Sequence, residues 1–203
     1  MIDGYRTVAG VSSARIRRKR SRFESIVGPV ESMDEVEAGL ERLRKVHHGA
    51  SHVCSAYRLR GKEDPIEGGD DNGEPTGSAG LPMLQQLQRL DLLDTLAVVV
   101  RHYGGVNLGV GGLVRAYGDA VSAALEEAQI VDRHIETTIA VSFSPELTSA
   151  VMGVIHRHGA KVQSIEYDAQ ARVLVALPPS RVSGFVDGVR EASGSRATTE
   201  VAD

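Results

Sequence analysis

The 203-residue chain has no tryptophan, a single cysteine and few aromatic residues, which make up 4% of the sequence. One thiol, Cys54, excludes an intrachain disulfide and a metal site with several thiolate ligands, and it suits a reducing compartment. Proteins that bind single strands of nucleic acid by base stacking usually carry more aromatic side chains. The net charge of −4 also argues against tight, general binding of nucleic acid by the chain as a whole.

Long apolar runs are absent as well. No stretch approaches the roughly 20 apolar residues that a membrane-spanning helix needs. The first residues, MIDGY, lack the basic start and apolar core of a signal peptide, so we expect a cytoplasmic protein without a membrane anchor. Hydrophobic residues at 41% and charged residues at 25% are ordinary for a globular protein, and the length suits one large or two small domains.

Glycine is concentrated in the middle of the chain, within residues 101–117, which read RHYGGVNLGVGGLVRAY and are called here the glycine motif. Five glycines fall within nine positions: Gly104, Gly105, Gly109, Gly111 and Gly112. They lie between a strand-like apolar stretch and a helix-like one, so the loop could hold an anion at a helix N-terminus, with Arg101 and Arg115 adding charge. Alternatively, the glycines only permit close packing of the loop. No P-loop sequence is present.

A second unusual run, the upstream motif, covers residues 70–84 and reads DDNGEPTGSAGLPML. Its residues Asp71, Asn72, Gly73 and Glu74 are compatible with a hard cation, although the spacing is not that of an EF-hand. A solvated acidic loop is the simpler interpretation. A third is that Asp71 or Glu74 pairs with Arg101 or Arg115, which would join the two motifs in one surface edged by opposite charges.

Hydrophobic periodicity divides the chain into two α/β modules that meet near residues 131–135. The first contains expected strands at 5–10, 14–27, 52–59 and 96–103 and expected helices after the Ser32–Glu35 capping box, near 76–90 and at 113–128, with a polar loop at 61–75. The second has the order β-α-β-β-α-β over residues 136–201, which is typical of a ferredoxin-like domain. An α+β protein with domains 1–133 and 134–203 is therefore predicted.

The two motifs together closely resemble the signature of the IMPACT/YigZ family, over roughly residues 15 to 130. The chain departs from the family at His102-Tyr103, where Tyr-Phe is usual, and at Asn107, where Lys is frequent. The resemblance implies an N-terminal module related to domain IV of the translocating elongation factor and a C-terminal module like its ferredoxin-like domain V. In eukaryotic relatives the module binds an activator of the stress-responsive translation kinase. For a two-module chain the resemblance implies a role linked to translation or nucleic acid.

A basic segment near the N-terminus is the best candidate for contact with phosphate groups. If residues 14–27 form one strand, alternation places three of its cations on each face, although such a face is often merely solvated. The segment contains Arg15, Arg17 and Lys19 for one face, and Arg18, Arg20 and Arg22 for the other.

We expect a non-enzymatic binding or regulatory protein whose partner is the ribosome, RNA or a translation-associated protein, without a cofactor or metal. The expected binding residues are Asp71, Asn72, Gly73, Glu74, Arg101, Tyr103, the five glycines of the glycine motif, Arg115 and Tyr117. The alternatives are a hydrolase and a protein that binds a phosphate ligand, each using the groove between the motifs. Possible bases and nucleophiles such as His52, His102 and Cys54 occur, but no catalytic motif accompanies them.

Overall fold

The computed structural model describes residues 3–202, which form two compact units. The N-terminal unit comprises Arg6–Arg133, and the C-terminal unit comprises the residues from His134 onward together with those up to Tyr5. Strands β1 (Gly4–Val8) and β7 (Ile130–His134) pair with each other, and the boundary between the units falls within both strands. Within residues 3–202 no helix is long and apolar enough to span a membrane.

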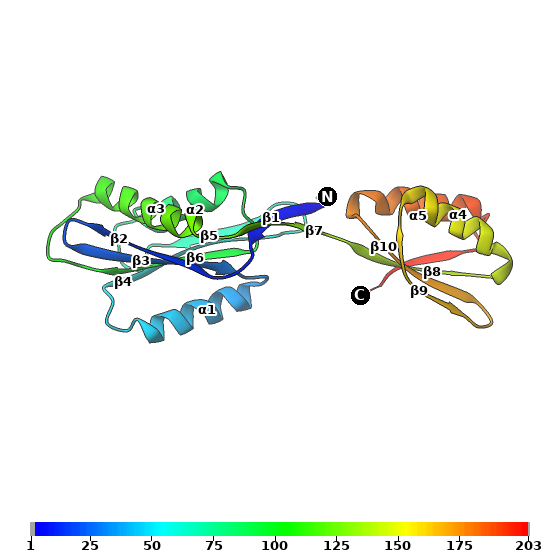
Figure 1. Ribbon diagram of the computed structural model, residues 1–203, viewed down its shortest axis with the longest axis horizontal. Coiled ribbons are helices and arrows are strands. Elements are labelled where there is room, and N and C mark those ends of the chain that lie inside the picture. Colours follow the sequence, from blue (N-terminus) through cyan, green and yellow to red (C-terminus); the bar gives the residue numbers. More distant parts are fainter. Residues whose placement is uncertain (1–2, 203) are drawn as a thin grey trace. The chain divides into compact units, whose positions relative to one another are not determined.

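The N-terminal unit is built on a five-stranded antiparallel sheet in the order β2-β3-β6-β4-β5. Helices α2 and α3 cover one face of the sheet and α1 lies on the other (Figure 1). The strands are β2 (Ser12–Arg18), β3 (Ser21–Pro29), β4 (His52–Leu59), β5 (Ile66–Asp70) and β6 (Thr95–His102), and the helices are α1 (Met33–Val46), α2 (Gly80–Arg89) and α3 (Val110–Glu126).

The central strand, β6, is buried on both faces, as its unbroken apolar run predicts. Ala97 and Val99 belong to the core beneath α2 and α3, whereas Val98 and Val100 belong to the core beneath α1. Because its side chains alternate between two hydrophobic cores, the strand needs apolar residues at successive positions.

The predicted capping of α1 is confirmed. Ser32 accepts a hydrogen bond from the backbone N–H of Glu35 at its Oγ, and the Glu35 carboxylate accepts one from the backbone N–H of Glu31. This differs from a standard capping box, in which the glutamate would return to Ser32 itself.

The single strand expected at residues 14–27 is wrong, because the chain reverses at Lys19 and Arg20 and forms the β2–β3 hairpin. Lys19 has a φ of +52°. The sequence does not predict this conformation, because hairpin turns with positive φ usually contain Asn or Gly. Two long-range contacts hold the turn: Lys19 donates from Nζ to the carbonyl of Asn107, and the backbone of Arg20 lies against Gly104.

The polar loop expected at 61–75 contains the edge strand β5, which the sequence missed because Gly68 and Gly69 obscure it. A Cβ on Gly69 would lie 2.8 Å from the carbonyl carbon of Gly80, and one on Gly68 would lie 2.7 Å from the Tyr57 hydroxyl oxygen. The two glycines therefore allow β5 to pass close to the start of α2 and to the Tyr57 ring.

The C-terminal unit has the predicted β-α-β-β-α-β order, and its antiparallel sheet has the strand order β11-β8-β10-β9. Alternate residues of β8 and β10 face the two long helices, which lie on one side of the sheet (Figure 1). The α+β class is thus confirmed. The elements are β8 (Thr137–Phe143), the 3₁₀ helix η1 (Pro145–Leu147), α4 (Thr148–His158), β9 (Lys161–Tyr167), β10 (Ala171–Leu177), the 3₁₀ helix η2 (Pro179–Arg181), α5 (Val182–Ala192) and β11 (Thr198–Ala202).

Candidate functional site

The carboxylate of Asp71 holds the upstream motif in shape. Its oxygens accept hydrogen bonds from the backbone N–H groups of Gly77, Ala79 and Gly80, at 2.7 to 2.8 Å. Burial opposes ionisation of this carboxyl group, but the three donors outweigh burial and hold its pKa below the ordinary value. Asp71 thus caps the N-terminus of α2, although it lies several residues before the helix in the sequence. Within residues 3–202 it forms no ion pair with Arg101 or Arg115, so that predicted pairing does not occur.

Asn72 attaches the same motif to β4. Its Oδ1 accepts a hydrogen bond from the backbone N–H of Val53, and its carbonyl oxygen lies 2.9 Å from Nδ1 of His52. Asn72 and Gly73 have φ values of +42° and +85°, so the chain turns sharply at these two residues. The turn directs the following side chain, Glu74, into the protein.

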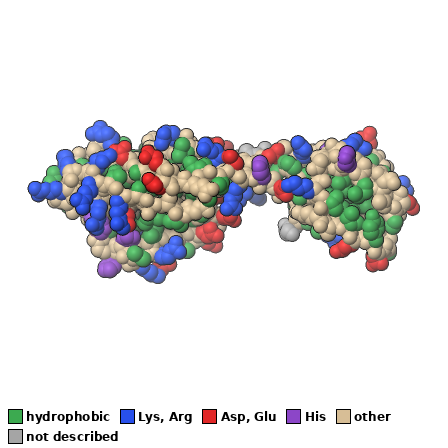
Figure 2. Space-filling model, viewed as in Figure 1, with side chains coloured by type: hydrophobic (Ala, Val, Ile, Leu, Met, Phe, Trp, Pro, Cys, Tyr) green, Lys and Arg blue, Asp and Glu red, His purple; other side chains and the backbone are tan. Residues whose placement is uncertain are grey.

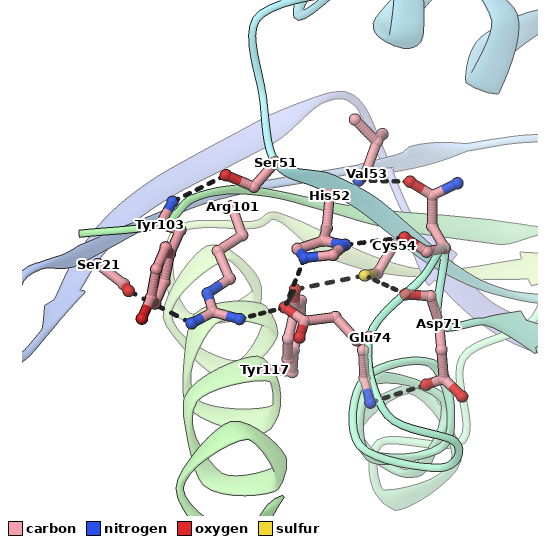
Figure 3. Close-up of polar contacts among 12 residues, drawn as sticks. Ser21, Ser51, His52, Val53, Cys54, Asp71, Glu74, Arg101, Tyr103 and Tyr117 are labelled. Atoms are coloured by element: carbon pink, nitrogen blue, oxygen red, sulfur yellow. Dashed lines mark hydrogen bonds and ion pairs between the residues drawn. The ribbon is translucent and has the colours of Figure 1, made fainter. Parts of the chain in front are cut away.

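Glu74 joins the two motifs through a buried polar network (Figure 3). Its Oε1 accepts hydrogen bonds from Nη1 of Arg101 at 2.5 Å and from the hydroxyl of Tyr117 at 2.7 Å. Of the four pairings that the sequence left open between the two motifs, the one between Glu74 and Arg101 occurs. The expected location is wrong, however: the Tyr117 residue is fully buried and the Glu74 and Arg101 side chains are only 3% and 6% exposed. The opposite charges neutralise each other inside the unit and do not edge an open surface.

Arg101 is held between two aromatic rings. Its guanidinium carbon lies 5.5 Å from the ring centroid of Phe23 and 5.3 Å from that of Tyr103, within the range of cation–π attraction. Its Nη2 lies 3.4 Å from Oγ of Ser21, whereas the buried Nε has no hydrogen-bond partner among the described residues. Phe23 also packs edge to face against Tyr117, which closes the network from below.

The glycines of the glycine motif meet different needs. A Cβ on Gly104 would lie 2.1 Å from the Arg20 carbonyl carbon, so close packing explains this glycine. Gly105 and Gly109 have φ values of +79° and +74°, and Gly109 is the N-cap of α3. A Cβ on Gly112 would lie 3.1 Å from Cβ of Leu108, whereas one on Gly111 would have no neighbour within 4 Å. Close packing therefore explains Gly104 and Gly112, and backbone conformation explains Gly105 and Gly109, but neither explains Gly111.

A pocket of about 510 Å³ lies between the two motifs and above the buried ion pair. Four of its lining residues were predicted as binding residues, namely Glu74, Arg101, Tyr103 and Gly109. The other residues that line it, which the sequence did not single out as binding residues, are Ser51, His52, Pro75, Asn107, Leu108, Val110 and Leu113.

His52 was missed as a lining residue because its position depends on strand register. It pairs with Arg101 across β4 and β6, so both side chains point to the same face of the sheet. Its Nε2 lies 3.9 Å from Oε1 of Glu74, and its side chain is 24% exposed. No local pattern in the sequence signals this register.

The remaining predicted binding residues lie around the pocket without lining it. Asp71, Asn72 and Gly73 shape the loop that carries Glu74, and Tyr117 lies beneath the floor as part of the core. Arg115 is exposed on α3, and within residues 3–202 it makes no ion pair.

The β2–β3 hairpin redistributes the cations of the basic segment. Arg17 lies directly opposite Arg22, and Arg15 opposite Glu24, so three arginines share one face of the sheet. The assignment of Arg22 to the face of Arg18 is therefore wrong. Arg15 forms an ion pair with Glu24 and lowers its pKa through a hydrogen bond, while Arg18 pairs with Asp119. Figure 2 shows Lys and Arg side chains gathered at this end of the N-terminal unit.

A nucleophile paired with a base is absent from the described residues. Burial raises the pKa of the Cys54 thiol to about 12, and the thiol donates a hydrogen bond to the carbonyl of Asp71. The Ser51 hydroxyl accepts a hydrogen bond from the backbone N–H of Tyr103. Within residues 3–202, no hydrogen bond joins a serine, threonine or cysteine side chain to a histidine ring.

The fold and the site define a two-unit α+β protein with a pocket between two glycine-rich motifs. The sequence model of the Impact N-terminal domain matches residues 19–125, and the chain belongs to the IMPACT family. It is 30% identical to IMPACT family member YvyE of Bacillus subtilis, covering 97% of this chain and 90% of that protein. It is 33% identical to IMPACT family member YigZ of Escherichia coli, covering 82% of each chain.

Two other similarities differ in how much of the chain they cover. Protein IMPACT of Xenopus laevis is 38% identical over 103 residues, which are 49% of this chain and 32% of that protein. A crystal structure of a hypothetical protein matches all of this chain and 99% of its own, with a TM-score of 0.69 and 28% identity. The similarity to the bacterial relatives thus extends over most of this chain, whereas the similarity to the Xenopus protein covers about half of it.

Proposed function

We propose that this chain is a non-enzymatic binding protein of translation, which contacts the ribosome or another RNA through the surface around the basic hairpin and the glycine motif. The relation to eukaryotic IMPACT proteins supports a translation-related regulatory role. Because translation takes place in the cytoplasm, the proposal places the protein there.

The observation that carries the proposal is the pairing of Arg17 with Arg22 across the hairpin. Like charges directly opposite each other destabilise a pair of strands, and among residues 3–202 neither arginine forms an ion pair. Arg15 lies on the same face and has one carboxylate, from Glu24, as its partner. Phosphate groups would supply the missing negative charge, and binding would then depend strongly on salt.

The turn of the hairpin lies against the glycine motif. Lys19 donates a hydrogen bond to the carbonyl of Asn107 at 2.7 Å, and Gly104 packs on the backbone of Arg20. Arg17 and Arg22 themselves project from the face of the sheet that α1 covers, opposite the face of Arg101, so a partner that contacts them reaches the glycine motif only around the hairpin turn.

The proposal is tested by co-sedimentation of the full chain with ribosomes and by RNA binding over a series of salt concentrations. The variant Arg17→Glu/Arg22→Glu is compared with Arg42→Glu/Arg89→Glu, which makes the same change in net charge at exposed positions of α1 and α2. We expect the hairpin variant to lose binding and the slope of log K against log salt to fall by about 1 to 2 for the two lost phosphate contacts.

The control variant is expected to bind nearly as the native chain does. Binding that is insensitive to salt, or that both variants weaken equally, would contradict contact through the hairpin. All four arginines are exposed, and substitutions at such positions usually change stability by less than about 0.5 kcal/mol. Circular dichroism of each variant checks that the fold is retained.

A further inference from the structure

The floor of the pocket contains one side-chain N–H donor, Nε of Arg101, that the rest of the described chain does not use. Arg101 is 5% exposed and lines the pocket, and its Nε has no hydrogen-bond partner among the described residues. A buried donor without an acceptor is unfavourable, because it has lost its hydrogen bond to water. An acceptor supplied by a ligand in the pocket would replace that hydrogen bond.

The N-terminus of α3 reaches the same pocket. Its N-cap, Gly109, and its first residue, Val110, are lining residues, and the first backbone hydrogen bond of the helix runs from Leu113 to Gly109. The N–H groups of the three residues in between therefore have no acceptor within the helix. The first turn contains no acidic side chain, so the positive end of the helix dipole is not neutralised.

Gly111 lies in this first turn and has no steric reason to be glycine. No heavy atom would lie within 4 Å of a Cβ at this position, and its backbone is helical, where glycine is less favourable than alanine. Close approach of a ligand to the backbone would explain the absence of a side chain.

Tyr103 provides a flat apolar wall. It is 46% exposed and lines the pocket, while its hydroxyl is fixed by a hydrogen bond to Oδ1 of Asn107. The one carboxylate among the lining residues, that of Glu74, is already neutralised by Arg101. The pocket thus combines a site for an oxyanion with a site for an aromatic ring.

We infer that this pocket binds a single nucleotide, with its phosphate at the N-terminus of α3 and at Nε of Arg101, and its base against Tyr103. The volume of about 510 Å³ lies within the range of pockets that hold small ligands. The inference rests on the proposed contact with RNA and specifies the ligand of the pocket as one nucleotide. This nucleotide is either free or the phosphorylated end of an RNA.

The first experiment titrates the full chain with adenosine monophosphate, adenosine and inorganic phosphate by calorimetry. We expect the monophosphate to bind at least about tenfold more tightly than adenosine, because only the monophosphate reaches the helix N-terminus. Equal affinity for the two, or no binding of any phosphate compound, would overturn the inference.

The variant Gly111→Asp adds a negative charge in the first turn of α3, beside the backbone N–H groups assigned to the phosphate. It should retain the fold, because an acidic residue in the first turn is favourable and the position has free space. We expect its dissociation constant for adenosine monophosphate to rise at least about tenfold, while Gly111→Asn, a neutral control of the same shape, shows a smaller change. Equal affinities of Gly111→Asp and Gly111→Asn, with both folded, would contradict the assigned phosphate position.

The variant Tyr103→Ala tests whether the base stacks on the ring of Tyr103. We expect about a tenfold weaker affinity for adenosine monophosphate and an unchanged affinity for inorganic phosphate, because stacking of one base contributes about 1–3 kcal/mol. Tyr103→Phe retains the ring and should bind as the native chain does. If Tyr103→Ala binds the nucleotide normally, the base does not lie on this ring.

Oligoribonucleotides with a 5′-phosphate or a 5′-hydroxyl distinguish the two sources of the nucleotide. Tighter binding of the phosphorylated oligonucleotide than of the free nucleotide supports an RNA end, and equal binding supports a free nucleotide. Loss of nucleotide binding in Gly111→Asp with ribosome binding intact separates the pocket from the hairpin. If the chain binds nucleotides but neither ribosomes nor RNA, the proposed function is wrong, whereas nucleotide binding by the pocket is still supported.

Discussion

Nη1 of Arg101 lies 2.5 Å from Oε1 of Glu74, and this contact links two motifs at a place where both side chains are almost fully buried. Removing two charges from water is unfavourable, so the pair need not stabilise the fold relative to an apolar pair of the same volume. What it does provide is a fixed geometry. With Tyr117 as a second donor, Glu74 can adopt this position only when both motifs are in place.

Loss of the carboxylate should strongly destabilise the N-terminal unit. In Glu74→Ala, Arg101 becomes a buried charge without a counterion, and we expect the free energy of unfolding to fall by about 3–5 kcal/mol. Urea denaturation followed by circular dichroism measures the change. Glu41→Ala, which breaks the exposed pair with Lys45, serves as the control and should change the value by less than about 1 kcal/mol.

The double variant Glu74→Ala/Arg101→Met distinguishes an unpaired charge from lost packing. Removal of both charges should restore part of the stability that Glu74→Ala loses, because no isolated charge remains. If the double variant is less stable than Glu74→Ala by the full effect of a second substitution, the pair is not coupled as the distance suggests.

Patterns of hydrophobic periodicity predicted the elements that bury apolar side chains regularly. The central strand β6, helix α1 with its Ser32 cap and the order of elements in the C-terminal unit all follow from such patterns. The β2–β3 turn and strand β5 were missed, because contacts distant in sequence determine them. Asn107 and Gly104 hold the turn at Lys19, and the backbone of Gly80 accommodates Gly69.

The candidate site was predictable only in part for the same reason. Opposite charges in the two motifs indicated, as one of three interpretations, that Asp71 or Glu74 would pair with Arg101 or Arg115, and Glu74 and Arg101 are the two that meet. Their burial was not indicated, because it depends on the rings of Phe23 and Tyr117 packing around them. The role of His52 depends on strand register, which the sequence of β4 does not contain.

Cys54 should be inert in the native protein. Burial raises the pKa of its thiol to about 12, and its single S–H is directed at the carbonyl of Asp71. Because the thiolate is the reactive form, a thiol reagent at pH 8 should label the native chain far more slowly than the chain in denaturing urea. Rapid stoichiometric labelling of the native protein would show that the network opens readily.

The capping role of Asp71 predicts a specific pH dependence. Its pKa is lowered in the folded chain from the ordinary 3.8, so its contribution to stability is present above that pH and is lost as the pH falls through the folded value. Asp71→Asn should therefore be less stable than the native chain by about 1–2 kcal/mol at pH 7, and the gap should close below about pH 4. The control variant Glu37→Gln, at an exposed position of α1, should have nearly the same free energy of unfolding as the native chain at both pH values. If Asp71→Asn remains less stable than the native chain in acid, the substitution acts through lost packing and not through the charge of Asp71.

Two glycines of the same motif should respond to alanine in opposite directions. Gly104→Ala would place Cβ 2.1 Å from the Arg20 carbonyl carbon, so either the β2–β3 turn or the glycine loop must shift, and we expect a destabilisation of about 2 kcal/mol or more. Gly111→Ala adds a methyl group in free space within the first turn of α3 and should stabilise the chain by about 0.5–1 kcal/mol. Thermal unfolding of both variants checks the two signs. A destabilising Gly111→Ala would mean that this glycine has a structural role within the protein, which would remove the reason for assigning the space above it to a ligand.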